Sequence, residues 1–579
     1  MKRWIAFAAI LALAVVALLI VERRHIEAEV SPAPILYFVA DTERELTRIP
    51  MSLTRMSDQE EIEIGNEMAK SFLEASQAND TPEYREIASY VNSVGARLGE
   101  HAYRNLPYRF HYIPQDQFVN AFALPGGHVF IGKGLLNLMD TEDELANVLG
   151  HEIEHIELGH CAERVQVETG VKNLPLGAIV HLPIEVFEMG YSKEQEVEAD
   201  RNGTKLAVTA GYSAEGAISM FQRFQKLEDA IQRYRASAPQ QRTVLDLPVE
   251  IGNVVVLQTL EGYFRSHPPN RERIAQIQQL IANEHWPADQ QQRPLAVAYL
   301  LVTDEAARYL AADQLDKAMD AARKALAAKP HYPPALKIVG DVDFDKADFA
   351  GASAMYGQTL QLDPKQAHVA AGYATALSAS LPAQQALAQY SELPNAAPAL
   401  RDAPWFVVEQ TGLKLMTGDM TAAKALAQQL SKEENADAPL LQGRLGWWYY
   451  HFGDLQSAAD LIGLSVEQRP QVKWLSAELG WTLAAQKKYI SAKQSFYQAG
   501  GTGNTHTRAD CEMGIAVAAW NQSQPDEAVP SYRLAVRLRS AWANSQWVAA
   551  LYGPQVGAST HAIGAEDERR KNAERKVKQ

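Results

Sequence analysis

The stretch TEDELANVLGHEIEH, residues 141–155, combines a helix start with three side chains suited to metal chemistry. Its first four residues form a capping box, and apolar residues follow at helical spacing, so the stretch is predicted to be one helix. Residues four apart on a helix differ by about 40°, and the imidazoles of His151 and His155 therefore project from one face. Glu152 lies about 100° round from His151, within reach of a metal-bound water.

This HExxH pattern suits the metal-assisted hydrolysis of a peptide bond. A bound metal ion polarises the carbonyl group and acidifies a water molecule, and a glutamate takes the proton and later delivers it to the leaving amine. We therefore predict one Zn2+ per chain, bound by His151 and His155, with Glu152 as the catalytic base.

The third metal ligand is predicted to come from a second helix. His160 lies about 140–180° from the other two imidazoles on the helical wheel, so it is expected at the helix end or beside a ligand, and not on the metal. A second capping box precedes Glu196 and Asp200, which share one helix face. Glu196 is predicted to complete a His2Glu site with one position open for water, and Asp200 to accept a hydrogen bond from a ligating histidine. The alternative for both carboxylates is a solvated acidic helix face.

The composition restricts the class of partner. Lys and Arg number 55 against 70 Asp and Glu, which gives a net charge of −15 over 579 residues and argues against nucleic acid as a partner. The hydrophobic fraction of 47% is ordinary for a globular protein. Cys161 and Cys511 are the only cysteines, which excludes a disulfide scaffold and leaves their pairing with each other open.

The amino end carries a predicted targeting segment. An uninterrupted apolar run, residues 4–21, follows Lys2 and Arg3 and would measure about 27 Å as a helix, enough to cross a bilayer core. We predict that residues 1–25 are a retained membrane anchor or a cleaved signal peptide, and that the rest of the chain leaves the cytoplasm. Residues 26–57 contain three prolines and are predicted to be a linker.

The carboxyl half repeats with a period of 34 residues. Small residues recur at that interval, with one step of 38, at Ala306, Gly340, Ala374, Gly412, Gly446, Gly480 and Gly514. The pattern resembles the tetratricopeptide repeat, a helix–turn–helix unit whose small residues permit close helix crossing. Residues 296–548 are predicted to form an α-solenoid of seven helix pairs, followed by a charged tail, 549–579, that is solvated from Glu566 onward. The aromatic run 447–450 either binds peptides or fills the space between helices.

Together these motifs resemble those of the gluzincin metallopeptidases related to the HtpX heat-shock protease and the CAAX prenyl proteases. HEIEH is followed by the family's ExxAD motif at Glu196–Asp200, within a peptidase domain expected at residues 58–290. The segment 120–127 is similar to the family's NAFxxPGG strand and turn, whose edge is expected to bind extended substrate. The residues of this segment expected to take part are Asn120, Ala121, Phe122, Pro125, Gly126 and Gly127.

A further motif belongs to the same resemblance. Ser266-His267-Pro268-Pro269 with Arg273 resembles the family's SHP motif and the arginine that follows it. The resemblance implies that His267 stabilises the oxyanion or caps the zinc, and that Arg273 acts beside it or supports the metal ligands. The alternative for His267 is a turn residue before two prolines. The segment 171–190 is a candidate lid over the site.

The resemblance implies a mainly α fold, in which a gluzincin metallopeptidase domain with a small β-sheet precedes the α-solenoid of tetratricopeptide repeats. One export segment combined with such repeats looks most like the periplasmic BepA-like branch. It implies a zinc metalloendopeptidase of the periplasm, or of the inner-membrane surface, that degrades misfolded or stalled outer-membrane proteins. The repeats are then expected to dock unfolded substrates or the outer-membrane assembly machinery. A repeat-based chaperone or scaffold with a latent peptidase domain is the alternative function.

Overall fold

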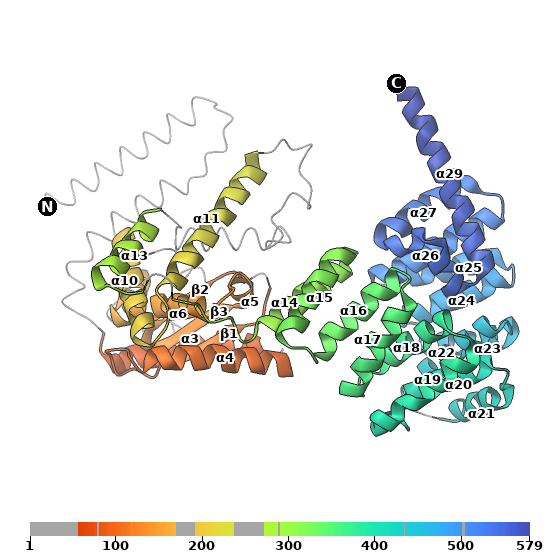
Figure 1. Ribbon diagram of the computed structural model, residues 1–579, viewed down its shortest axis with the longest axis horizontal. Coiled ribbons are helices and arrows are strands. Elements are labelled where there is room, and N and C mark those ends of the chain that lie inside the picture. The colour runs from red at the N-terminus through yellow and green to blue at the C-terminus, as the bar shows by residue number, and fades with distance from the viewer. Residues whose placement is uncertain are drawn as a thin grey trace. The chain divides into compact units, whose positions relative to one another are not determined.

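The computed structural model describes residues 56–77, 80–116, 118–169, 191–236, 271–287, 290–433, 435–500 and 504–578. The predicted targeting segment, most of the predicted linker and the candidate lid lie outside the described residues. The chain divides into two compact units, one on each side of the link between Leu295 and Ala296 (Figure 1). Among the described helices, none has both the length and the apolar character that a membrane crossing requires.

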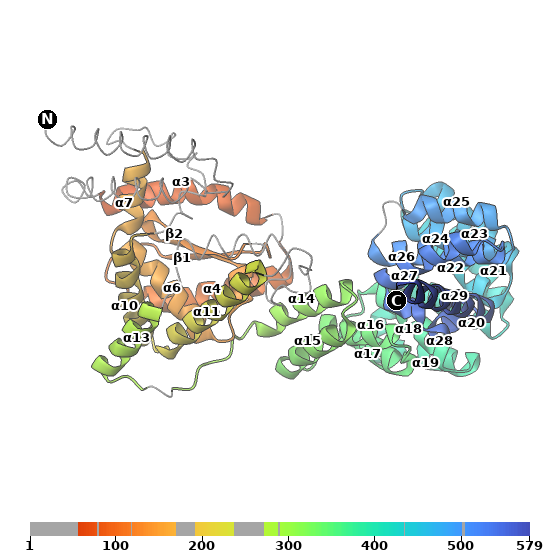
Figure 2. The same ribbon diagram turned by 90° about the horizontal axis from the view of Figure 1, so that it is seen from above.

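The first unit is built on a three-stranded sheet. Strands β1 (Arg109–Ile113), β2 (Ala121–Leu124) and β3 (His128–Gly132) are ordered β1-β3-β2, with β3 parallel to β1 and antiparallel to β2. Figure 2 shows the sheet between α3 on one side and α4 and α6 on the other. The larger helices of this unit are α3 (Asp58–Gln77), α4 (Pro82–Gly99), α6 (Glu142–Glu157), α7 (His160–Thr169), α10 (Lys193–Thr209), α11 (Glu215–Ala236) and α13 (Arg271–Glu284).

Aromatic and small residues bring the helices close to this sheet. The Phe72 ring of α3 lies 5.2 Å, centre to centre, from the rings of both Phe122 and Phe130. The turn between β2 and β3 is a short 3-10 helix, Pro125–Gly127, and Gly126 has a φ of +76°, a conformation that glycine adopts without strain. A Cβ added at Gly126 would lie 2.4 Å from the Cα of Ile62, so α3 lies directly on this turn.

Helix α6 is the central element of the first unit. Its predicted capping box is confirmed, because Thr141 accepts a hydrogen bond from the Glu144 backbone and Glu144 returns one to the Thr141 backbone. All residues from Asp143 to Glu157 are buried, although several of them are charged. Such a helix has neighbours on every side, and the polar side chains buried there need specific partners.

The second unit consists of paired helices, as the 34-residue period predicts. Fourteen helices run from α14 to α27 in seven consecutive pairs. They are α14 (Ala298–Ala311), α15 (Leu315–Ala328), α16 (Pro333–Asp345), α17 (Phe349–Leu362), α18 (Ala367–Ser380), α19 (Ala383–Ala396), α20 (Pro404–Met416), α21 (Met420–Leu430), α22 (Ala438–Phe452), α23 (Leu455–Gln468), α24 (Lys473–Ala485), α25 (Tyr489–Gly500), α26 (Thr505–Asn521) and α27 (Pro525–Leu538). The predicted mainly α fold with a small sheet and a helical repeat array is therefore confirmed.

The recurring small residues lie where helices cross. A Cβ added at Gly340 would approach the Tyr356 ring to 2.8 Å, and one added at Gly480 would approach the Phe496 ring to 2.6 Å. Each glycine therefore accommodates an aromatic ring of the next helix. The aromatic run 447–450 is likewise buried, which favours its packing role over peptide binding.

The carboxyl end folds back onto the array through η5 (Ser540–Ala543), α28 (Ser545–Tyr552) and α29 (Pro554–Lys578). The expectation of a solvated tail from Glu566 onward is wrong for its first part. Asp567 is buried and pairs with Arg533 of α27, so the charges of this segment belong partly to a packed interface. A charged run read by itself does not reveal a partner that lies 34 residues away.

Candidate metal centre

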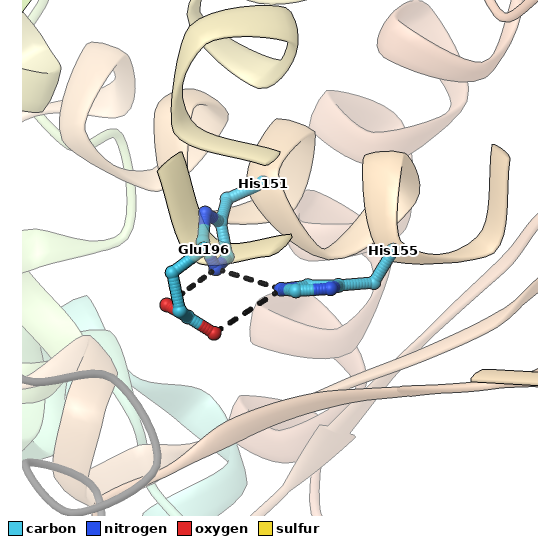
Figure 3. Close-up of side chains that lie close together, drawn as sticks. All are labelled: His151, His155 and Glu196. Carbon is cyan, nitrogen blue, oxygen red and sulfur yellow. Dashed lines mark hydrogen bonds and ion pairs between the residues drawn. The ribbon is translucent and has the colours of Figure 1, made fainter. Parts of the chain in front are cut away.

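Three potential metal ligands converge in the first unit, two from α6 and one from α10 (Figure 3). The Nε2 atoms of His151 and His155 are 3.1 Å apart. The two carboxylate oxygens of Glu196 each lie 3.6 Å from one of these nitrogens. Among the described residues, this is the group of His, Cys, Asp and Glu side chains with the geometry for a metal ion.

The donor set fits a tetrahedral ion. A zinc ion bound at about 2.0–2.1 Å has ligand atoms about 3.4 Å apart, and the observed separations of 3.1 and 3.6 Å lie on either side of that value. All three side chains are buried. Two imidazole nitrogens and one carboxylate are a ligand set that zinc takes in hydrolytic sites, with a fourth position for water or substrate.

His151 is held by a buried ion pair. Its Nδ1 lies 2.9 Å from Oδ1 of Asp200, and Arg273 donates to both oxygens of that carboxylate over 2.5 and 2.6 Å. Burial raises the pKa of Asp200, but the charge and hydrogen bonds of Arg273 outweigh it and hold this pKa well below its usual range. The ionised carboxylate accepts the Nδ1–H of His151, which leaves the Nε2 lone pair directed at the metal position.

The imidazole of His155 contacts a second histidine instead of a carboxylate. Its Nδ1 lies 3.0 Å from Nδ1 of His160, the first residue of α7. For His155 to present an Nε2 lone pair, its Nδ1 has to donate this hydrogen bond. His160 thus lies at a helix end beside a predicted ligand, as expected, and outside the three-residue donor group, although α6 ends at Glu157 and the helical-wheel angle does not extend to residue 160.

Glu152, next to His151 on α6, is buried. The negative charge of Glu152 contributes to raising the pKa values of His151, Cys161 and Tyr191, which lie around the candidate metal centre. Glu154, two residues further on, has a pKa raised to about 7 by burial and by the charges of neighbouring carboxylates. Cys161 and Cys511 are both free and buried, and burial raises the pKa of the Cys161 thiol to about 12.

The predicted substrate strand is an edge strand. Among the described strands β2 pairs only with β3, and the Gly132 N–H donates to the Asn120 carbonyl over 2.9 Å. Because pairing alternates along an antiparallel strand, the backbone groups of Ala121 and Ala123 face the opposite side. The Cys161 sulfur lies 3.5 Å from the Ala123 carbonyl oxygen on that side.

One predicted site residue has no structural account, and two neighbours of the site were not predicted. His267 lies outside the described residues. Tyr191, whose ring stacks on His155, and Arg164, which stacks on Tyr191, were missed by sequence reasoning. The only signal in the sequence is that Tyr191 directly precedes the capping box of α10.

The fold and the site define a HExxH metallopeptidase domain followed by a helical repeat array. Residues 85–281 match the sequence profile of Peptidase family M48, so this part of the chain is an M48 peptidase domain, and the expected metallopeptidase class is confirmed. The match does not include the repeat array, which is established by its helix pairs.

Several curated proteins are similar to this domain. The beta-barrel assembly-enhancing protease of Escherichia coli O157:H7 is 27% identical over 177 residues, which cover 27% of this chain and 35% of that protein. The metalloprotease LoiP of Escherichia coli K12 is 29% identical over 27% of this chain and 67% of its own length. The mitochondrial metalloendopeptidase OMA1 of Arabidopsis thaliana is 32% identical over 22% of this chain and 28% of its own length.

Solved structures resemble the chain weakly. A tetratricopeptide repeat protein from Parabacteroides merdae matches 42% of this chain and 93% of its own, with 14% identity and a TM-score of 0.27. The pilF protein of Pseudomonas aeruginosa matches 42% of this chain and 92% of its own, with 16% identity and a TM-score of 0.21.

Proposed function

We propose that this protein is a zinc-dependent endopeptidase of the cell envelope that degrades misfolded or stalled outer-membrane proteins, and that its repeats dock the substrate or a partner of the assembly machinery. The observation that carries the proposal is the convergence of His151 and His155 of α6 with Glu196 of α10, beside the buried Glu152 of α6. The M48 match supports the class of reaction.

The residues around the site have distinct roles in this proposal. Zinc held by the three donors would polarise the scissile carbonyl and acidify a bound water. Glu152 would act as the general base that accepts a proton from the attacking water and as the acid that delivers it to the leaving amine. Asp200 and Arg273 hold the His151 imidazole in the tautomer that leaves Nε2 unprotonated.

The proposed substrate is an unfolded, extended chain. Strand addition at the edge of β2 uses the backbone of the substrate, so it selects extended segments with little dependence on sequence. An unfolded outer-membrane protein consists of segments of this kind. The relatives named for beta-barrel assembly support this substrate class, and the apolar run at residues 4–21 supports a location in the envelope.

The test compares two neighbouring glutamates of α6. We expect Glu152→Gln to lower the cleavage of casein and of an unfolded outer-membrane protein by about 10²–10⁴-fold, which is the usual contribution of a general base. Glu154→Gln is the matched control, because it changes the same group on the same helix two residues away. The purified wild type is expected to hold one zinc per chain, and His155→Ala to lose it. Equal cleavage by wild type and Glu152→Gln would contradict the endopeptidase and leave the chaperone or scaffold function.

A further inference from the structure

Tyr191 lies between the metal centre and a buried arginine. Its ring stacks on the His155 imidazole, with ring centres 3.8 Å apart and planes inclined by 16°. The guanidinium carbon of Arg164 lies 3.8 Å from the centre of the same tyrosine ring. Two planar groups cannot both lie at that distance over one face, so His155 and Arg164 cover opposite faces of Tyr191.

Three helices hold the tyrosine in this place. Tyr191 directly precedes Ser192, the N-cap of α10, and α10 also carries Glu196. Its hydroxyl oxygen lies 3.4 Å from the sulfur of Cys161 on α7, and Arg164 belongs to the same helix. The start of α10 therefore places both the carboxylate ligand and a ring against a ligand of α6.

We propose that Tyr191 is a positioning residue that sets the plane of the His155 imidazole, so that its Nε2 atom points at the metal position. The inference rests on the proposed function, because it takes His155 as a metal ligand. It adds to that function a residue that touches neither the metal position nor the reacting atoms.

The need for such a residue follows from the freedom of a histidine ring. Rotation about the bond between Cβ and the ring is broad and roughly two-fold. The 3.0 Å contact with His160 restrains one ring nitrogen of His155. The parallel stack with Tyr191 restrains the tilt of the ring, which a single hydrogen bond leaves loose.

The stack also favours the metal-bound form of the imidazole. A metal-bound imidazole carries part of the positive charge of the ion, and the face of a tyrosine ring is the negative side of its quadrupole. Arg164 is buried and is attracted to the other face for the same reason, which keeps the ring in its place. Losing the ring therefore removes both a steric and an electrostatic contribution to metal binding.

The experiment measures metal binding in the full chain with two substitutions of the same residue. Tyr191→Phe keeps the stacked ring and removes the hydroxyl, whereas Tyr191→Leu keeps an apolar side chain and removes the planar face. We expect Tyr191→Leu to bind zinc about 10–100-fold more weakly than wild type in competition with a chromogenic chelator. We expect Tyr191→Phe to match wild type. In the cobalt-substituted protein, the visible absorption band is expected to change in the leucine variant and to persist in the phenylalanine variant.

A matched control separates positioning from packing. Tyr84 of α4 is partly buried in the same unit and contacts the ring of Tyr112 at 5.7 Å, so Tyr84→Leu removes a comparable ring away from the site. Its zinc affinity is expected to equal that of wild type. Thermal unfolding of the metal-free proteins shows how much each substitution costs in stability alone. If Tyr191→Leu does not fold, Tyr191→Met makes the same comparison, because methionine fills irregular space.

The outcomes distinguish this inference from the proposed function. Equal zinc affinity and equal cobalt spectra for Tyr191→Leu and wild type overturn the inference alone. A loss in Tyr191→Phe as large as that in Tyr191→Leu also overturns it, because the hydroxyl would then be responsible. A wild-type protein that binds no zinc overturns the proposed function itself.

Discussion

At the scale of single residues, the metal centre depends on one buried ion pair. Asp200 and Arg273 are only 5% and 3% exposed, and they join α10 to α13 beside His151. Taking two charges out of water costs several kcal/mol for each ion. The bidentate contact between Arg273 and Asp200 and the further hydrogen bond from His151 to Asp200 offset that cost. Removing one partner of this pair is therefore expected to destabilise the protein strongly. The intact pair adds little net stability, and its proposed role is to orient the His151 imidazole.

We expect Asp200→Asn to weaken zinc binding about 10–100-fold and to destabilise the metal-free protein by about 3–5 kcal/mol. Affinity falls because an amide can present either its oxygen or its NH2 group to Nδ1 of His151, so it no longer holds the tautomer that leaves Nε2 unprotonated. Stability falls because the buried Arg273 loses its bidentate charged partner and keeps only the 3.3 Å contact with Glu196. Chelator competition and denaturant unfolding measure the two effects, with the exposed Asp229→Asn of α11 as the control. Unchanged zinc affinity in Asp200→Asn would contradict this role.

The sequence alone predicted which site residues share a face of the same helix. Within one helix the angle between side chains is fixed, so His151 and His155 had to share a face, and so did Glu196 and Asp200. The meeting of the two helices was predicted because the HExxH helix supplies only two metal ligands, so a third had to come from another helix, and the resemblance to a known family agreed with Glu196 in that role. Tyr191 and Arg164 could not be found, because their stack depends on how α7 approaches the start of α10 in space. The catalytic and ligand roles of all these residues stay predictions.

At the scale of whole elements, the site depends on the close approach of α6 and α10. A Cβ added at Gly203 of α10 would lie 2.6 Å from the backbone nitrogen of His151, and one added at Gly150 of α6 would lie 2.8 Å from the Gly203 carbonyl oxygen. These neighbours are backbone atoms, which cannot rotate away. The absence of side chains at both positions therefore lets Glu196 come within 3.6 Å of both imidazoles.

We expect Gly203→Ala to destabilise the protein by about 1–3 kcal/mol, because the added methyl group forces the two helices apart. The same displacement is expected to weaken zinc binding by moving Glu196 away from α6. Gly463→Ala is the control, since Gly463 lies within helix α23 with open space around its Cβ position. That change is expected to be neutral or to stabilise the protein by up to about 1 kcal/mol. A Gly203→Ala variant with wild-type stability and zinc affinity would show that the close approach is unnecessary.

The helix ends could be predicted where residues close together in the sequence determine them. Both capping boxes form, at the start of α6 and at the start of α10, because a capping box involves only residues three apart. The carboxyl tail shows where local reading fails. Its charges suggested exposure to solvent, but α29 packs on the array through Asp567 and Arg533.

At the scale of the whole molecule, the repeat array is joined to its own carboxyl end. Arg539 reaches Asp345 over 2.5 Å, and the Ser540 backbone donates to the Asp313 carboxylate over 2.7 Å. Further along, the Tyr450 hydroxyl donates to the Tyr552 carbonyl over 2.8 Å. These contacts span 194, 227 and 102 residues of sequence. The 34-residue period describes contacts between adjacent repeats, so it carried no information about this closure.

The closure partly buries the carboxylate of Asp510, which disfavours its charged form, so this group makes the stability of the array depend on pH. Burial, together with the nearby charge of Asp345, raises the pKa of Asp510 from 3.8 to about 6, although Arg539 opposes the shift from 3.9 Å. The folded array therefore binds this proton more tightly than the unfolded chain does. The contribution of Asp510 to the free energy of unfolding is expected to fall as the pH rises from about 4 to about 6, by roughly 3 kcal/mol for a shift of about two pKa units.

We expect Asp510→Asn to remove this loss, so that the variant is more stable than wild type at pH 7.5 and similar to it at pH 4. Eight of the ten tryptophans lie between residues 296 and 579, so denaturant unfolding followed by tryptophan fluorescence reports on the array. Asp402→Asn, at an exposed position of the same unit, is the control and is expected to follow the wild-type pH profile. If Asp510→Asn shows the same decline between pH 4 and pH 6 as wild type, the decline belongs to other groups. In that case the carboxylate enclosed by the carboxyl-terminal segment is already solvated enough to stay ionised without cost.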